Sequence, residues 1–307
     1  MTSNDMALEL FFLFQTGFGA LGNSFLLVLY AITFFIGHSM RPIDLLLSHL
    51  AFVNDLVLLS KGIPQTMAAL GFNNFLDDVG CKLVFYFHRV ARGLSLCTTC
   101  FLSGFQAITL SPRSSRWAEI KAQIPKYIVL FFSLCWTFHL VIYCNILLTV
   151  KGPTRIKNIT ENQNFIYCSA PTGVSVSVAL HALIFSLLDV LCVGIMVATS
   201  GYMIFVLYRH HQRVQYIRGN KITSGSSPET RATQTILLLV SMFVTFYSLN
   251  SILALNIHLG RLSSWLVHAS AFLNACFPAY SSFVLIVSDS QVPRYSLVLW
   301  ERIKLLL

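Results

Sequence analysis

Five charged side chains interrupt stretches of sequence that are otherwise apolar. They are Asp55, Lys61, Arg89, Arg92 and Asp189. A charge in apolar surroundings is costly unless it meets a partner, a ligand or water. These groups therefore either bind a charged ligand or form ion pairs that lock helices together. The pairs expected in the second case are Arg92 with Asp189 and Lys61 with Asp55. The spacing leaves both interpretations open.

The two arginines are three residues apart, which places their side chains on one face of a helix. We therefore expect Arg89 and Arg92 to point in the same direction. On the ligand-binding interpretation, they border an outward-facing pocket together with Asp189. His88 and Tyr86 are expected close by.

A second group of candidates is aromatic and lies further along the chain. Phe246, Tyr247 and Asn250 are separated by three or four residues, so they share one helix face, and Phe243 lies one turn before them. A pocket between helices needs apolar walls with a few polar anchors, which this group supplies. Packing against neighbouring helices is the alternative use of the same stripe.

Catalytic chemistry finds little support in the sequence. We find no nucleophile with a matching base, no paired carboxylates and no phosphate-cradling glycine loop in a plausible setting. Metal-ligand spacing is missing too, and the stretch 262–288 has no lysine for a retinal Schiff base. The sequence therefore predicts neither an enzyme nor a cofactor.

The amino-acid composition indicates whether these side chains are surrounded by water or by lipid. The chain has 307 residues, of which 55% are hydrophobic and 11% charged, and its mean hydropathy is +0.69. Ordinary soluble proteins carry roughly 25% charged residues. Most of the surface must therefore face lipid. The net charge of +9 suits an anionic phospholipid leaflet better than a nucleic acid.

Seven stretches are long enough to cross a bilayer, which takes about 20 mostly apolar residues. They are residues 10–36, 43–70, 83–110, 127–150, 177–207, 232–258 and 264–287, followed by a short tail at 288–307. Unpaired backbone groups are not tolerated in lipid, and continuous apolar runs of this length favour helices. The predicted fold is therefore all-α, a single seven-helix transmembrane bundle.

The distribution of basic residues predicts the orientation. With the amino terminus outside and the carboxyl terminus in the cytoplasm, the inner segments hold thirteen Lys and Arg and the outer segments five. Asn158 begins the only Asn-x-Ser/Thr sequon, in the largest outer loop, where glycosylation is possible. A chance sequon is the alternative interpretation.

Two of the eight cysteines lie outside the predicted spans. Cys81 is at the outer mouth of the third span and Cys168 is in the outer loop before the fifth. Both are placed in an oxidising compartment. We predict that they form a disulfide that fixes the loop over the mouth of the bundle.

The inner face carries a basic surface. Arg113 and Arg116 belong to the inner segment 113–126, expected to be a loop, whereas Arg209 and Arg213 belong to a predicted helical extension over 208–216. Sorting of positive charge to the cytoplasm explains these residues by itself. They are also candidates for contact with a G protein or with anionic lipid.

The helix count, the outer amino terminus and the disulfide resemble the rhodopsin-like G-protein-coupled receptors. Several strings narrow the resemblance to the vomeronasal type-1 receptors. These are 61–67, 80–86 with 88–90, 105–113, 167–171, 207–215, 227–234 and 275–278. The resemblance implies a small pheromone-like ligand, a heterotrimeric G protein of the Gi/Go class, and the plasma membrane of vomeronasal sensory neurons. A bitter-taste-like receptor and a small-solute transporter are the alternatives.

The chain also departs from the general rhodopsin-like pattern. Asn54 stands where the second span usually has an acidic residue, and Asp55 is about 100° further round the helix. The Asp-Arg-Tyr and Asn-Pro-x-x-Tyr motifs are missing. Vomeronasal type-1 receptors resemble this chain in lacking them, so the sequence leaves the activation switch unassigned.

Overall fold

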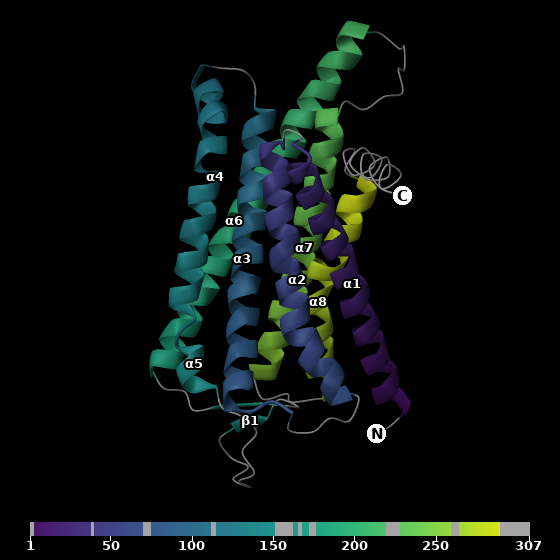
Figure 1. Cartoon of the computed structure of the whole chain (residues 1–307). Helices are drawn as coiled ribbons and strands as arrows, with labels where there is room; N and C mark the ends of the chain where they lie inside the picture. The colour runs from purple at the N-terminus through teal and green to yellow at the C-terminus, as the bar shows by residue number, and fades with distance from the viewer. Residues whose placement is uncertain are drawn as a thin grey trace.

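The structure is a computed structural model that describes residues 3–37, 40–69, 75–111, 115–150, 162–164, 168–171, 176–218, 228–258 and 264–288. Its helices are α1 (Ser3–Phe35), α2 (Pro42–Ala69), α3 (Asp78–Leu110), α4 (Ser115–Ile142), α5 (Ile146–Thr149), α6 (Val176–Arg218), α7 (Pro228–His258) and α8 (Ser264–Ser288). Seven of them are long and apolar enough to span a membrane. The predicted seven-helix bundle is confirmed (Figure 1).

The only strands among the described residues form a small hairpin at one end of the bundle. β1 (Asn162–Asn164) pairs antiparallel with β2 (Ser169–Pro171). Figure 1 shows α1 starting at this end, whereas α8 runs towards the opposite end. The start of α1 and the end of α8 therefore lie at opposite ends of the bundle.

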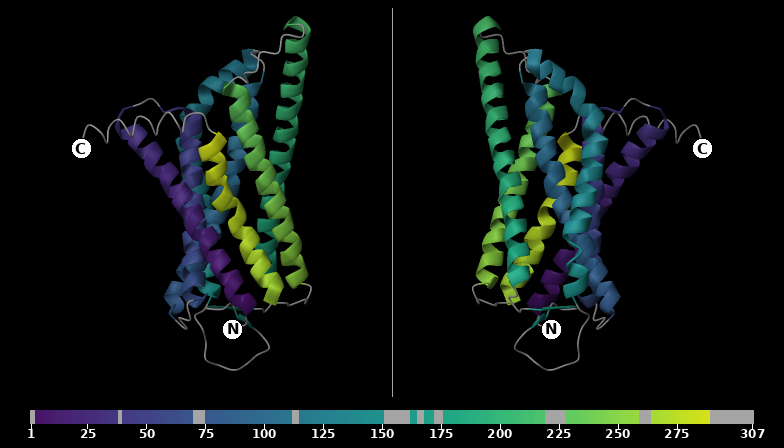
Figure 2. Two further views of the ribbon diagram at one scale, coloured as in Figure 1. Left: turned by 90° about the vertical axis from the view of Figure 1, so that its right-hand side faces the viewer. Right: turned by 90° about the vertical axis from the view of Figure 1, so that its left-hand side faces the viewer.

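Helix α3 is the central element of the bundle. It packs against α2, α4, α6 and α7, and about half of its residues are buried. The two views in Figure 2 show α6 extending beyond the other helices at one end. Spans α4 and α6 are the least buried of the seven, and their outer faces carry exposed Leu, Val, Ile and Phe side chains. These faces suit contact with acyl chains.

The helices are longer than their apolar stretches. Helix α3 begins at Asp78 rather than residue 83, and the Asp77 carboxylate caps it by accepting a hydrogen bond from the Gly80 amide at 2.7 Å. The expectation of a loop over residues 113–126 is wrong from Ser115 onward, because α4 begins there. Hydropathy marks the part of a helix that lies in lipid, whereas polar ends continue the same helix into the interface.

The ends of α4 and α6 test two further predictions about the helices. The stretch 127–150 is not one helix: α4 ends at Ile142, a turn follows, and α5 starts at Ile146. In contrast, α6 continues without a break to Arg218, which confirms the helical extension over 208–216.

The predicted disulfide between Cys81 and Cys168 is present, with 5.9 Å between the two Cα atoms. Both cysteines are buried, and Val150 packs against them. The bond fastens the segment that leads into β2 to the first turn of α3. It therefore holds the start of β2 against the end of the central helix.

Helices α1 and α8 approach each other closely. A Cβ atom added at Gly19 would lie 2.6 Å from the Cα atom of Ala279, so only glycine fits this crossing. One turn further on, the Asn23 side-chain amide donates to the Pro278 carbonyl oxygen at 2.8 Å. The close contact and this hydrogen bond fix α8, which supplies one wall of the cavity described next.

Candidate functional site

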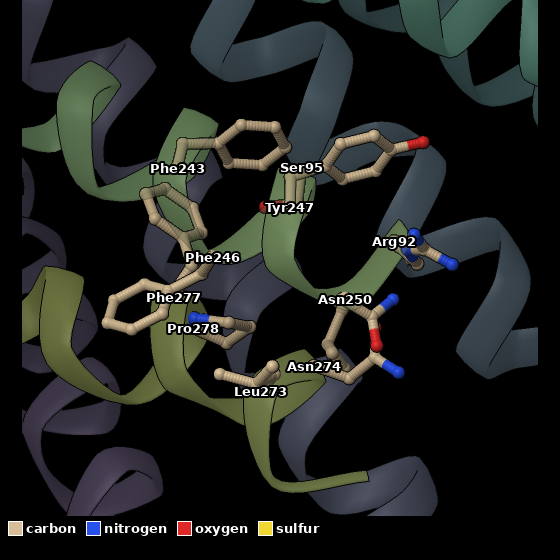
Figure 3. Close-up of a pocket in the computed structure, with 11 residues that line it drawn as sticks. Arg92, Ser95, Phe243, Phe246, Tyr247, Asn250, Leu273, Asn274, Phe277 and Pro278 are labelled. Atoms are coloured by element: carbon tan, nitrogen blue, oxygen red, sulfur yellow. The ribbon is translucent and has the colours of Figure 1, made fainter. Parts of the chain in front are cut away.

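A cavity lies between α2, α3, α7 and α8, with about 400 Å³ of space free of protein atoms, part of it continuous with solvent. Its lining residues are Val57, Arg92, Ser95, Phe243, Phe246, Tyr247, Asn250, Leu273, Asn274, Phe277 and Pro278. In the view of Figure 3, the three phenylalanines lie to one side, and Arg92 and the two asparagines lie to the other. The cavity therefore has an apolar wall and a polar wall.

The aromatic stripe predicted on the sixth span forms one side of this cavity. Phe243, Phe246, Tyr247 and Asn250 are consecutive lining residues of α7. The Phe243 ring also packs edge-on against Phe277 of α8, with 4.7 Å between ring centroids. Both uses proposed for the stripe are therefore combined, because the same rings pack the helices and face the cavity.

Arg92 and Asp189 do not meet as an ion pair. The Tyr247 hydroxyl donates a hydrogen bond to the Asp189 carboxylate, and the Arg92 guanidinium lies over the Tyr247 ring, 5.2 Å from its centroid. The expected salt bridge is therefore replaced by a tyrosine that joins α3, α6 and α7. A guanidinium held over a ring face keeps its N–H groups available for an acceptor.

The second expected ion pair is not formed either. Asp55 is buried and accepts a hydrogen bond from the Ser24 hydroxyl of α1 at 2.9 Å. Lys61 instead lines a smaller cavity together with His88. Among the residues that the structure describes, Lys61 has no carboxylate within 4.0 Å, since the ion pairs found there are Arg41 with Asp44 and Lys82 with Asp78.

Arg89 is exposed, but its surroundings are those of the bundle interior. Its charge interacts with Arg92 on its own helix, with Tyr143 next to α4, and with Asp189 on α6. A side chain that faced lipid would not lie near groups on both of those helices. We therefore interpret its exposure as access to open space between the helices.

The last two candidate residues, His88 and Tyr86, have different surroundings. His88 lines the smaller cavity, of about 230 Å³, which shares Val57 and Asn274 with the larger one. Tyr86 is buried and donates to the Leu140 carbonyl oxygen of α4 at 2.7 Å. Tyr86 therefore stabilises the contact between α3 and α4 rather than lining either cavity.

Sequence reasoning missed several polar residues beside the cavity. The Ser95 hydroxyl donates to the Asn54 side-chain oxygen at 2.7 Å, and the Asn54 amide donates to the Ser281 hydroxyl at 3.0 Å. This chain of bonds joins α2, α3 and α8 beside the cavity, which Ser95 itself lines. Ser95 lies one turn after Arg92 and therefore on the same face of α3. That spacing could have identified Ser95 from the sequence.

At the opposite end of α3, a polar contact replaces the missing Asp-Arg-Tyr motif. The Gln106 side-chain amide donates to the Thr233 hydroxyl of α7 at 3.0 Å, and both residues are buried. The hydroxyls of Ser111 and Tyr202 lie 2.9 Å apart and join α3 to α6. Three helices are therefore held together at this end by neutral hydrogen bonds.

The structure describes only some of the residues predicted to contact a G protein or to carry a glycan. Arg209 is exposed on α6. Arg116 and Arg213 lie in α4 and α6, and the structure fixes only their place in those helices. Arg113 and Asn158 lie outside the described residues.

Comparison with known proteins gives consistent matches. A family model described as the vomeronasal organ pheromone receptor family matches residues 6–297. The chain is similar to vomeronasal type-1 receptor 1 of Homo sapiens, with 47% identity over 92% of this chain and 80% of the relative. It is also similar to olfactory receptor class A-like protein 1 of Danio rerio, with 32% identity over 92% and 89%. Squid rhodopsin has the same fold, with a TM-score of 0.72 and 13% identity over 96% of this chain and 85% of that chain.

The first prediction concerns the tyrosine link. Tyr247→Phe removes the hydroxyl that donates to the Asp189 carboxylate. Asp189 is partly buried, and an acceptor that loses its donor away from water costs about 1–3 kcal/mol. We expect a lower midpoint of thermal unfolding for the purified protein in detergent. The matched control is Tyr280→Phe, because Tyr280 is exposed and makes no side-chain hydrogen bond within the described part of the chain. Equal midpoints for the two variants would contradict the assignment.

Proposed function

The chain belongs to the vomeronasal organ pheromone receptor family, whose members are chemosensory G-protein-coupled receptors rather than enzymes, and from this premise we propose what it binds and how it signals. The proposed ligand is a small pheromone-like molecule that enters the larger cavity from outside. The proposed partner is a heterotrimeric G protein of the Gi/Go class at the opposite end. The proposed location is the plasma membrane of vomeronasal sensory neurons.

The observation that carries the proposal is an amphipathic cavity lined by an arginine that has no direct ion pair among the described residues. The three phenylalanines of the cavity wall suit an apolar ligand body of small size. Arg92 faces the same space with no ion-pair partner among the described residues. The geometry therefore supports an apolar molecule that carries an acidic group.

Neighbouring charges strengthen this preference for an anion. Lys61 and Arg89 lie close enough to Arg92 for their charges to interact. The nearest acid, Asp189, already accepts a hydrogen bond from Tyr247. Three cations gathered in a region of low dielectric create a positive potential, which an anionic ligand relieves.

Signalling is proposed to follow from a shift between helix arrangements. A ligand changes such an equilibrium only by binding one arrangement better than the other. The inner contact between Gln106 and Thr233 is proposed to stabilise the silent arrangement, because it ties α3 to α7 where a G protein would enter. Opening of this contact would uncover the inner ends of α6 and α7.

The second prediction tests the anion site. Arg92→Ala and Arg89→Ala each remove a cation, and hydrogen bonds to charged groups contribute about 1.5–3 kcal/mol. With a G-protein reporter, we expect carboxylate and sulfate compounds to need at least about 10-fold higher concentrations for half-maximal response. The matching neutral alcohols should be unaffected. Lys82→Ala is the control, because Lys82 pairs with Asp78 away from the cavity. Anionic compounds that activate both arginine variants as well as the parent would refute the site.

The third prediction tests the inner contact. Gln106→Ala and Thr233→Val each break the bond between α3 and α7, and a hydrogen bond worth about 1 kcal/mol shifts an equilibrium about fivefold. We expect ligand-free reporter activity, corrected for surface expression, to rise by about that factor. Thr235→Val is the control, since the Thr235 hydroxyl bonds to the Arg231 carbonyl oxygen of its own helix. A rise in the control alone, or in none of the three, would contradict the proposal.

The fourth prediction tests the orientation. We expect an epitope tag at the amino end to bind antibody on intact cells, and a tag at the carboxyl end to bind only after permeabilisation. Asn158 should carry a glycan, so Asn158→Gln should abolish the mobility shift caused by an N-glycosidase. Two tags detected on the same face would contradict the topology, whereas an unshifted parent protein would contradict only the glycan.

A further inference from the structure

Four thiols from three helices meet inside the bundle, on the side of α3 that faces α4 and α6. Cys97 and Cys100 lie one turn apart on α3, Cys135 lies on α4 and Cys192 lies on α6. Cys97 lies near enough to both Cys135 and Cys192, and Cys100 near enough to Cys192, for the thiols to influence one another's ionisation. All four thiols are partly exposed. They form a contiguous group that plays no part in either cavity.

A histidine completes this cluster. The His139 Nδ1 atom lies 2.8 Å from the Cys135 carbonyl oxygen, and its Nε2 atom lies 3.8 Å from the Cys97 sulfur. A carbonyl oxygen only accepts, so Nδ1 carries the proton and donates it. The lone pair of Nε2 therefore faces the Cys97 thiol. A nucleophile, a base and a group that orients the base are the parts that activate a thiol.

The imidazole is seated in space that only a glycine leaves open. A Cβ atom at Gly93 would lie 2.2 Å from the His139 Cδ2 atom and 2.5 Å from Nε2. The ring is buried against the backbone of α3. The position of Nε2 beside Cys97 is therefore fixed by packing as well as by hydrogen bonding.

The surroundings decide which reagents reach the cluster. Helices α4 and α6 are the least buried spans, and the thiols between them lie in the middle of apolar segments. A water-soluble reagent would have to leave water to reach them, whereas a molecule dissolved in acyl chains arrives directly. The natural reactant for partly exposed thiols in this setting is a lipophilic oxidant.

We propose that Cys97 is an oxidation site that reacts with a lipophilic hydroperoxide and then forms a disulfide with Cys135. His139 Nε2 takes the Cys97 proton, and the thiolate attacks the terminal peroxide oxygen. The O–O bond breaks, the alkoxide leaves as an alcohol with that proton, and Cys97 becomes a sulfenic acid. The Cys135 thiol then attacks the Cys97 sulfur, so that an S–S bond forms and water leaves. Two thiols lose two electrons and the peroxide gains them.

The new bond would tie α3 to α4 in the middle of the membrane. Cys135 is assigned as the second thiol because its carbonyl oxygen orients His139, and because Cys97 is the thiol that influences its ionisation most. This site does not rest on the proposed receptor function. Its chemistry is measured without a ligand or a G protein.

The test uses the full-length protein in lipid nanodiscs treated with cumene hydroperoxide. Thiols that remain are alkylated with N-ethylmaleimide without reduction and counted by intact mass. We expect the six free thiols to fall to four, with a digest that contains a Cys97 peptide joined to a Cys135 peptide. Cys144→Ser, which removes an exposed thiol outside the cluster, should still lose two. Cys97→Ser should lose none.

Two further variants keep the proposal testable if Cys97→Ser fails to fold. In Cys135→Ser, the sulfenic acid on Cys97 should accumulate and be trapped by dimedone. In His139→Gln, the rate of oxidation should fall by about 100-fold, the order expected when a general base is lost. The alkylation rate of Cys144 should stay unchanged in that variant, which separates loss of the base from general disorder.

Other outcomes overturn the assignment. Six labelled thiols after treatment, or a bond between Cys100 and Cys192 alone, would show that Cys97 is not the reactive thiol. A bond between Cys97 and Cys192 would remove Cys135 from the proposal. Sulfinic acid on Cys97 with no cross-link would show that no second thiol is in reach.

Discussion

Polar groups within the hydrocarbon thickness must find their partners inside the protein, because acyl chains offer none. Some polar side chains bond to a carbonyl oxygen of their own helix, and others bond to a neighbouring helix. Tyr247 donates to the Asp189 carboxylate and lies under the Arg92 guanidinium. Asn54 of α2 bonds to serine hydroxyls of α3 and α8. Each of these contacts stabilises the fold. Each also determines which polar side chains stay available to bind a ligand.

The use of tyrosine in place of an ion pair has a chemical consequence for the cavity. A salt bridge between Arg92 and Asp189 would neutralise both charges and occupy the guanidinium donors. A phenol instead satisfies the carboxylate by donation and attracts the guanidinium through its ring face. Positive charge therefore stays beside an apolar wall. That combination of features is what an amphipathic anion requires.

The sequence predicted the elements better than the contacts between them. Span number and the disulfide of Cys81 with Cys168 follow from hydropathy and from the position of each cysteine, which are local properties of the chain. The partner of Asp189 could not be predicted in this way, because the choice between Arg92 and Tyr247 depends on the rotation of three helices about their axes. Periodicity gives the face of one helix but not the face that meets it.

The expected loop over 113–126 illustrates a second limit. Hydropathy distinguishes segments that suit lipid from segments that suit water. Helix α4 includes both kinds of segment without a change in backbone conformation. The thiol cluster illustrates a third limit of prediction from sequence.

Each cysteine in an apolar span looks like any small packing residue in the sequence. Only the packing of α3 against α4 and α6 brings four of these cysteines together.

The two ends of the bundle are connected through α3 and α7 by matched spacings. Arg92 and Gln106 are fourteen residues apart on α3, as are Thr233 and Tyr247 on the antiparallel α7. Fourteen residues make nearly four turns and span about 21 Å, so each pair lies on one helix face. The helices α3 and α7 are therefore joined at two places, by the Arg92 cation over the Tyr247 ring beside the cavity and by the hydrogen bond between Gln106 and Thr233 at the other end. On the proposed function, a ligand that changed the contact of Arg92 with Tyr247 would tilt both helices, and the hydrogen bond at their other ends would then be either made or broken. Such a discrete contact is what coupling between distant sites requires, and it needs no charged Asp-Arg-Tyr motif.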